Sequence, residues 1–296
     1  MKIIIPLTHK NTTLSNLASN RPESLLSLAG NTILGHVLNL VKPKPTDEII
    51  FASGQYEETI KVWVAENFPA LNASFVHIDT GGRSKSILAC RDYLDDEPVL
   101  VVSRRTLSEC DYAAIPDAAA DVVVMSQPDK LEEDAKIWWF RNGRSLLAAL
   151  QATTNYNDAL KQLRSEGAVI VRKPVKQWLD ARTPGNLLNA NKRLLALGRG
   201  ATPEAIDRSY AEDFTAMPPV YIAADAYIES AVVGPYTHIG AGVTVKNAII
   251  SNSIIEDNAT IENCILNGAI VGQNTQISGK TQKIFVGDNA KVQLTN

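Results

Sequence analysis

The chain has 296 residues, 45% of them apolar, which is enough for two domains that each bury a core. The 29 basic and 32 acidic residues leave a net charge of -3, so charge gives no reason to expect a nucleic acid or a membrane surface as a partner. The three cysteines lack metal-ligand spacing, and no apolar run reaches the length of a signal-peptide core or a membrane span, which together predict a reduced, cytoplasmic protein.

Residues 1–197 alternate short apolar runs with helical patterns. Strands are predicted at 2–6, 48–52, 73–77, 98–103, 121–125, 136–140 and 168–172, and helices at 32–41, 56–66, 84–94 and 144–151. This alternation predicts an α/β domain with a mainly parallel sheet and helices on both faces. Ligands bind beyond the carboxyl ends of the strands in such sheets, so the loop at 7–23 and the turn at 103–106 are candidate site segments.

Residues 198–219 are polar and contain three prolines, which predicts a linker. From 220 onward, apolar residues recur in steps of five or six, separated by Gly, Asn, Asp and Ser. This is hexapeptide periodicity, in which three short strands and their turns make one coil of a parallel β-helix. We expect about three to four stacked coils over 220–296. The alternative is an ordinary all-β domain built from hairpins.

Two further segments carry a resemblance to a known family. Residues 95–115 and the segment WLDARTPGNLLNANKRLL at 178–195 match in frame, and the N-terminal segment keeps several scaffold residues: Thr12, Leu14, Leu17, Pro22, Leu25, Leu26 and Gly30. These segments, together with the order of an α/β domain followed by a β-helix, resemble the sugar-phosphate nucleotidylyltransferases that end in a left-handed β-helix. This family is also called the NDP-sugar pyrophosphorylases. The resemblance implies a Rossmann-like nucleotidyltransferase domain. It also implies a reaction in which a sugar 1-phosphate attacks a nucleoside triphosphate and pyrophosphate leaves.

The N-terminal loop departs from the family in the residues that handle phosphate. Family glycines are replaced by His9 and Asn11, whose Cβ atoms crowd a close phosphate. The family arginine position is Thr13. The family lysine that follows a proline is Glu23 in this chain, a reversal of charge that would repel phosphate.

The metal positions depart as well. The resemblance implies two aspartates that hold Mg²⁺, the first in an Asn-Gly-Asp turn. Here that turn reads Ser103-Arg104-Arg105, and the second aspartate is kept as Asp180 with Arg182 in place of a glycine. The family segment Gly-Thr-Ala, which lies near the nucleotide base, reads Gly82-Arg83-Ser84 here. The stretch from 124 to 136 is too short to contain the family's sugar-binding hairpin.

These losses predict a family member without catalysis and without catalytic residues. It would act as a regulatory or structural subunit, or bind a sugar nucleotide or phosphate. No cofactor is expected, and Mg²⁺ only if catalysis survives. Asp180 is the one candidate metal ligand, with capping of the following helix as the alternative. The candidate nucleotide- or phosphate-binding residues are Lys10, Thr12, Gly82, Arg104 and Arg105.

Two other functions stay open at this point. The chain could be an active nucleotidylyltransferase with a rearranged site, or His238 in the β-helix could serve an acyltransferase. The stackable β-helix predicts a homo-oligomer, or a hetero-oligomer with an active paralogue. The sequence does not specify a base or a sugar.

Overall fold

The computed structural model describes residues 1–8, 13–14, 17–18, 20–79, 81–117, 119–126, 137–153, 155–175, 177–201 and 213–279. The chain divides into two compact units, Met1–Ala201 and Thr202–Asn296. Within the described residues, no helix combines the length and apolar character needed to cross a membrane.

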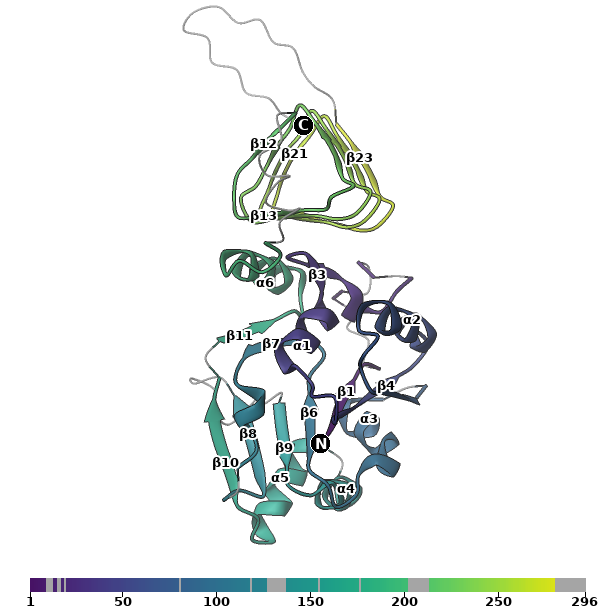
Figure 1. The fold of residues 1–296 in the computed structure, drawn as a ribbon, viewed down its shortest axis with the longest axis vertical. Coiled ribbons are helices and arrows are strands. Elements are labelled where there is room, and N and C mark those ends of the chain that lie inside the picture. The colour runs from purple at the N-terminus through teal and green to yellow at the C-terminus, as the bar shows by residue number, and fades with distance from the viewer. Residues whose placement is uncertain are drawn as a thin grey trace, which may run out of the picture. The chain divides into compact units, whose positions relative to one another are not determined.

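The first unit is built on a seven-stranded sheet (Figure 1). Its strands, in spatial order, are β10 (Ile170–Pro174), β8 (Val122–Ser126), β9 (Ile137–Phe140), β6 (Val99–Val102), β1 (Lys2–Pro6), β4 (Glu48–Ser53) and β5 (Ala73–His77). Neighbouring strands are parallel except β9, which runs antiparallel to both β6 and β8. The prediction of a mainly parallel sheet is therefore confirmed.

Helices cover this sheet because successive residues of its central strands are buried on opposite faces. In β1, Ile4 belongs to one core cluster while Ile3 and Ile5 point to the other face, and all three are at most 1% exposed. The helices are α1 (Ile33–Val41), α2 (Glu57–Asn67), α3 (Arg83–Ala89), α4 (Gly143–Ala152), α5 (Tyr156–Ser165) and α6 (Pro184–Ala196), with short 3-10 turns η1 (Glu23–Leu25), η2 (Arg91–Tyr93) and η3 (Tyr112–Ala114). Two small antiparallel pairs complete the unit: β2 (Ser27–Leu28) with β3 (Asn31–Thr32), and β7 (Thr106–Glu109) with β11 (Gln177–Asp180).

The second unit is a left-handed parallel β-helix whose coils form the triangle seen end-on in Figure 1. Over the described residues 213–279, three four-stranded parallel sheets give four coils. The first sheet contains β12 (Thr215–Ala216), β15 (Val232–Val233), β18 (Ile249–Ser251) and β21 (Ile265–Asn267). The second contains β13 (Val220–Ile222), β16 (Thr237–Ile239), β19 (Ile254–Ile255) and β22 (Ile270–Val271), and the third β14 (Tyr227–Glu229), β17 (Thr244–Lys246), β20 (Thr260–Glu262) and β23 (Gln276–Ser278).

Sequence periodicity explains this coil. Ile222, Ile239, Ile255 and Val271 are stacked in register, and each is at most 4% exposed. At the corners the chain needs left-handed backbone, and asparagine tolerates it well. Among the described residues, five such corners carry an asparagine with φ between 46° and 57°: Asn247, Asn252, Asn258, Asn263 and Asn274. The first strand, β12, begins inside the range 198–219 that was expected to be a linker, and residues 202–212 of that range lie outside the described residues.

Candidate functional site

The candidate site lies where loops follow the carboxyl ends of β1, β5 and β6. The antiparallel pairing of β7 with β11 sets Thr106 opposite Asp180, and the Ala181 amide donates a hydrogen bond to the Arg105 carbonyl at 3.1 Å. The two positions that the resemblance assigns to metal binding, Arg105 and Asp180, are thus cross-strand neighbours. Lys10 and Thr12 lie outside the described residues.

Glu23 binds both arginines of the turn after β6. Its Oε2 atom lies 3.0 Å from Nη2 of Arg105 and 3.4 Å from Nη2 of Arg104. All three side chains are buried, with residue exposures of 9%, 8% and 6% respectively. The sequence predicted that Glu23 would repel a bound phosphate, and it did not predict this ion cluster. Its ion-pair partners come from a turn about eighty residues further along the chain.

Burial also alters the acid–base properties of the two guanidinium groups. It lowers the pKa of Arg104 to about 9, with the positive charge of Arg105 as the next cause. Burial likewise lowers the pKa of Arg105, while Glu23 and Asp180 oppose that shift. With a pKa of about 9, Arg104 remains protonated at neutral pH. The Nε atom of Arg104 is buried, and no described residue is a hydrogen-bond partner for it.

The residues at the metal positions do not fit Mg²⁺. Asp180 forms an ion pair with Nε of Arg182, and the second position is occupied by Arg105. Magnesium prefers several oxygen ligands, whereas this arrangement sets cations on both sides of one carboxylate. Among the described residues, no group of three or more His, Cys, Asp or Glu side chains could hold a metal ion. Asp180 does not cap α6 either, because Thr183 accepts the capping hydrogen bond from the Asn186 amide.

Gly82 and Arg83 lie at the start of α3, after the carboxyl end of β5. Gly82 is exposed, and a Cβ atom placed there would meet no other atom within 4 Å. The Arg83 guanidinium lies 4.5 Å from the centre of the Trp138 ring, which in turn packs 4.2 Å from the ring of Tyr156. The charge of Arg83 contributes to the lowered pKa of Arg104, so these two cations are close.

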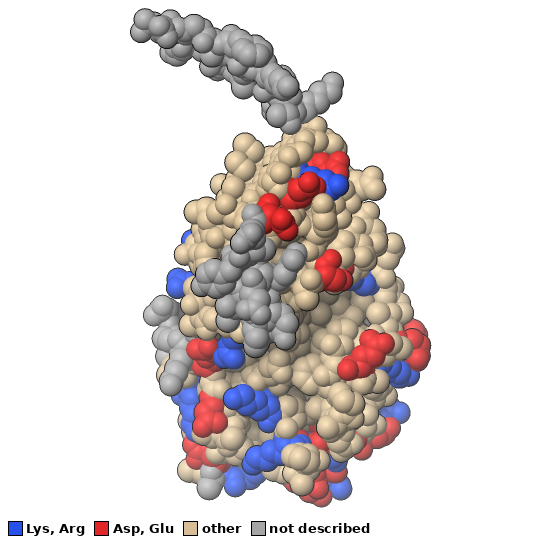
Figure 2. All heavy atoms as spheres, turned by 45° about the horizontal axis from the view of Figure 1, so that its top comes forward, with Lys and Arg blue, Asp and Glu red and all other residues tan. Residues whose placement is uncertain are grey.

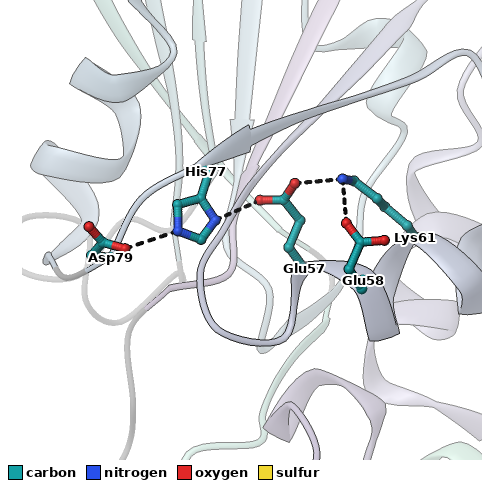
Figure 3. Close-up of polar contacts among 5 residues, drawn as sticks. All are labelled: Glu57, Glu58, Lys61, His77 and Asp79. Carbon is teal, nitrogen blue, oxygen red and sulfur yellow. Dashed lines mark hydrogen bonds and ion pairs between the residues drawn. The ribbon is translucent and has the colours of Figure 1, made fainter.

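A second polar cluster, which was not predicted from the sequence, lies near the end of the edge strand β5 (Figure 3). The two ring nitrogens of His77 contact Glu57 at 2.9 Å and Asp79 at 3.0 Å, and Lys61 bridges Glu57 and Glu58. Hydrogen bonds that the ring donates to the carboxylates of Asp79 and Glu57 raise the pKa of His77. The only sequence signal was a histidine at the end of a predicted strand with an aspartate two residues on.

The candidate histidine of the β-helix is packed. The His238 ring stacks on Tyr221 of the preceding coil, with centroids 4.9 Å apart and planes at 14°, and the residue is 3% exposed. This position offers no open face for an acyl donor. Figure 2 shows acidic and basic side chains interspersed over the face drawn, in keeping with the small net charge.

Comparisons with known proteins agree with this architecture. No protein-family model matches the chain. The bifunctional protein GlmU of Francisella philomiragia is 27% identical over 109 residues, which cover 37% of this chain and 22% of that protein, so the match spans under a quarter of its length.

Solved structures are similar over about two thirds of the chain. A protein assigned as a glucose-1-phosphate thymidylyltransferase from Bacillus anthracis has a TM-score of 0.56 at 15% identity and covers 67% of this chain and 95% of its own. A nucleoside-diphosphate-sugar pyrophosphorylase from Vibrio cholerae has a TM-score of 0.53 at 13% identity, covering 64% of this chain and 99% of its own. This chain therefore contains the fold of the nucleoside-diphosphate-sugar pyrophosphorylases, as the sequence resemblance predicted.

Proposed function

We propose that this chain is a non-catalytic relative of the sugar nucleotidylyltransferases, acting as a structural or regulatory subunit that binds a phosphorylated ligand. One observation carries the proposal: Glu23, Arg104 and Arg105 form a buried ion cluster at the positions where the resemblance requires a lysine and a metal ligand. The partner would be a second copy of the chain or an active paralogue.

The chemistry of nucleotidyl transfer supports this reading. Catalysis of phosphoryl-type transfer depends on positioning and on cations placed against the developing charge. In this chain, a buried carboxylate already neutralises part of the cationic charge, and the kept aspartate is paired with Arg182. Positive charge is present at this edge of the sheet, but of the two aspartates that the resemblance assigns to Mg²⁺ only Asp180 is kept.

A turnover assay tests the proposal directly. Pyrophosphate release would be measured with each common nucleoside triphosphate and sugar 1-phosphate in the presence of Mg²⁺, with an active nucleotidylyltransferase as the positive control. We expect no release above the background without enzyme. Clear turnover that Asp180→Ala abolishes would establish the alternative, an active transferase with a rearranged site.

A further inference from the structure

The Glu23 cluster contains more buried positive charge than negative charge. Two buried guanidinium groups, Arg104 and Arg105, contact the single buried carboxylate of Glu23. Arg83 and Arg182 add positive charge nearby, which lowers the pKa of Arg104 and of Arg105 respectively. Charges removed from water are costly unless they are compensated by opposite charge and hydrogen bonds. This imbalance favours an additional anion at the same place.

The geometry of the two arginines suits a phosphate. In the contacts described above, Oε2 of Glu23 accepts a hydrogen bond from each guanidinium. Nε of Arg104 is buried and has no hydrogen-bond partner among the described residues. A phosphate offers more acceptor oxygens than one carboxylate, and the planar guanidinium fork binds it through two parallel hydrogen bonds. The turn also follows the carboxyl end of β6, the edge at which sheets of this kind bind ligands.

Glu23 can leave this position by rotation of its own side chain, because three single bonds separate its carboxylate from the backbone. It lies in η1, a single 3-10 turn of three residues that follows Pro22. Displacement of the carboxylate therefore needs no change in the sheet.

We propose that Arg104 and Arg105 bind a phosphate or pyrophosphate group without a metal ion, and that Glu23 is an internal carboxylate that occupies this site until the ligand displaces it. This inference rests on the proposed function, for which it names the ligand class and the binding residues. The same chemistry is offered by free pyrophosphate, a sugar 1-phosphate and a nucleoside diphosphate.

Calorimetric titration of the full chain with inorganic pyrophosphate, in the presence of a chelator, tests the proposal. We expect wild-type protein to bind, and Glu23→Gln to bind about tenfold or more tightly, because removing the competing carboxylate leaves the arginines available. Arg104→Gln and Arg105→Gln should each weaken binding by about tenfold or more. The matched control is Glu58→Gln, which removes one negative charge from an exposed side chain of the same unit and should bind like wild type.

Circular dichroism would check that each variant is folded. If Glu23→Gln does not fold, Glu23→Asp, which keeps the charge but shortens the reach, should also bind more tightly than wild type. Arg105→Lys should recover little of the affinity, because an ammonium group lacks the planar fork. Parallel titrations with a sugar 1-phosphate and a nucleoside diphosphate identify the source of the phosphate group by the tightest binding.

Three results would overturn the inference: no binding by wild type or Glu23→Gln, binding that requires Mg²⁺, or equal effects of Glu23→Gln and Glu58→Gln. None of them bears on whether the chain catalyses nucleotidyl transfer, which the turnover assay measures separately. Turnover in that assay would reject the non-catalytic function, and the calorimetric data would still decide whether Arg104 and Arg105 bind a phosphate group.

Discussion

His77 is held between two carboxylates, Asp79 and Glu57, on the surface of the α/β unit (Figure 3). Both contacts favour the protonated ring, which is why the pKa of His77 is raised. A group whose pKa is raised by folding stabilises the folded state fully below its unfolded pKa of about 6.5. That contribution is lost as the pH rises through the higher folded pKa.

We expect the pH titration of His77, followed by NMR, to give a pKa above 6.5. Asp79→Asn and Glu57→Gln should each lower that pKa, because each removes one negative partner of the ring. His36 serves as an internal control, since burial lowers the pKa of its ring. A His77 pKa at or below that of His36 would contradict the description of the cluster.

The Glu23 cluster shows where residue-level reasoning from sequence reaches its limit. The charge reversal at Glu23 and the arginine at position 105 were both identified in the sequence, as two separate losses of family chemistry. Their side chains meet at 3.0 Å, so the two changes are one exchange of opposite charges. A single sequence contains no signal that joins positions so far apart, and only the fold shows that they are complementary.

At the scale of elements, α6 is fixed to the turn between β2 and β3 through a buried side chain. Asn191 is fully buried, and its Oδ1 accepts a hydrogen bond from the Ala29 amide at 2.9 Å. Ala29 has a φ of 42°, a conformation that is uncommon for alanine. The asparagine thus stabilises a strained turn as well as satisfying a buried donor.

Asn191→Leu should lower the free energy of unfolding of the first unit by about 1–3 kcal/mol, because it leaves the Ala29 amide buried without its acceptor. Asn189→Leu is the matched control: it makes the same change at an exposed position of the same helix and should have little effect. Urea unfolding followed by tryptophan fluorescence is suitable, since all four tryptophans lie in Met1–Ala201. Equal losses in the two variants would show that this hydrogen bond adds no stability.

Element boundaries followed closely from apolar patterning, whereas element direction and some pairings did not. The run at 137–140 reads like every other apolar strand, and nothing in it indicates that β9 is antiparallel. The helix at 156–165 is short and polar on one side, and it was not predicted. The β7–β11 pair was also not predicted, because its strands are about seventy residues apart and only the fold brings them together.

At the scale of the whole molecule, the first sheet of the β-helix presents an apolar row on its outer face. Val232, Ile249 and Ile265 are stacked in register, and the last two are 45% and 74% exposed. The corresponding positions of the third sheet carry threonine in the middle coils, Thr244 and Thr260. Exposed apolar rows of this kind favour association with another protein surface.

We expect the full chain to form an oligomer that the β-helix stabilises. Light scattering should give the full protein a mass above that of one chain. A truncation ending at Ala201 should have the mass of a single chain. Ile265→Lys should weaken the assembly by adding a charge to the apolar row, whereas Thr260→Lys on the third sheet should leave it unchanged. A monomeric full-length protein would disprove this expectation.

The exchange of charges between Glu23 and Arg105 also restricts how this protein can evolve. Glu23→Lys alone would set three cations together in a buried place, and Arg105→Asp alone would set two carboxylates beside Arg104. Each of these single substitutions should lower the free energy of unfolding by about 3–5 kcal/mol, while the double variant should recover part of that loss. Additive losses in urea unfolding would refute this coupling. If the coupling holds, a lysine at position 23 and an aspartate at position 105 can be introduced only together, because either substitution alone gives a poorly folded protein.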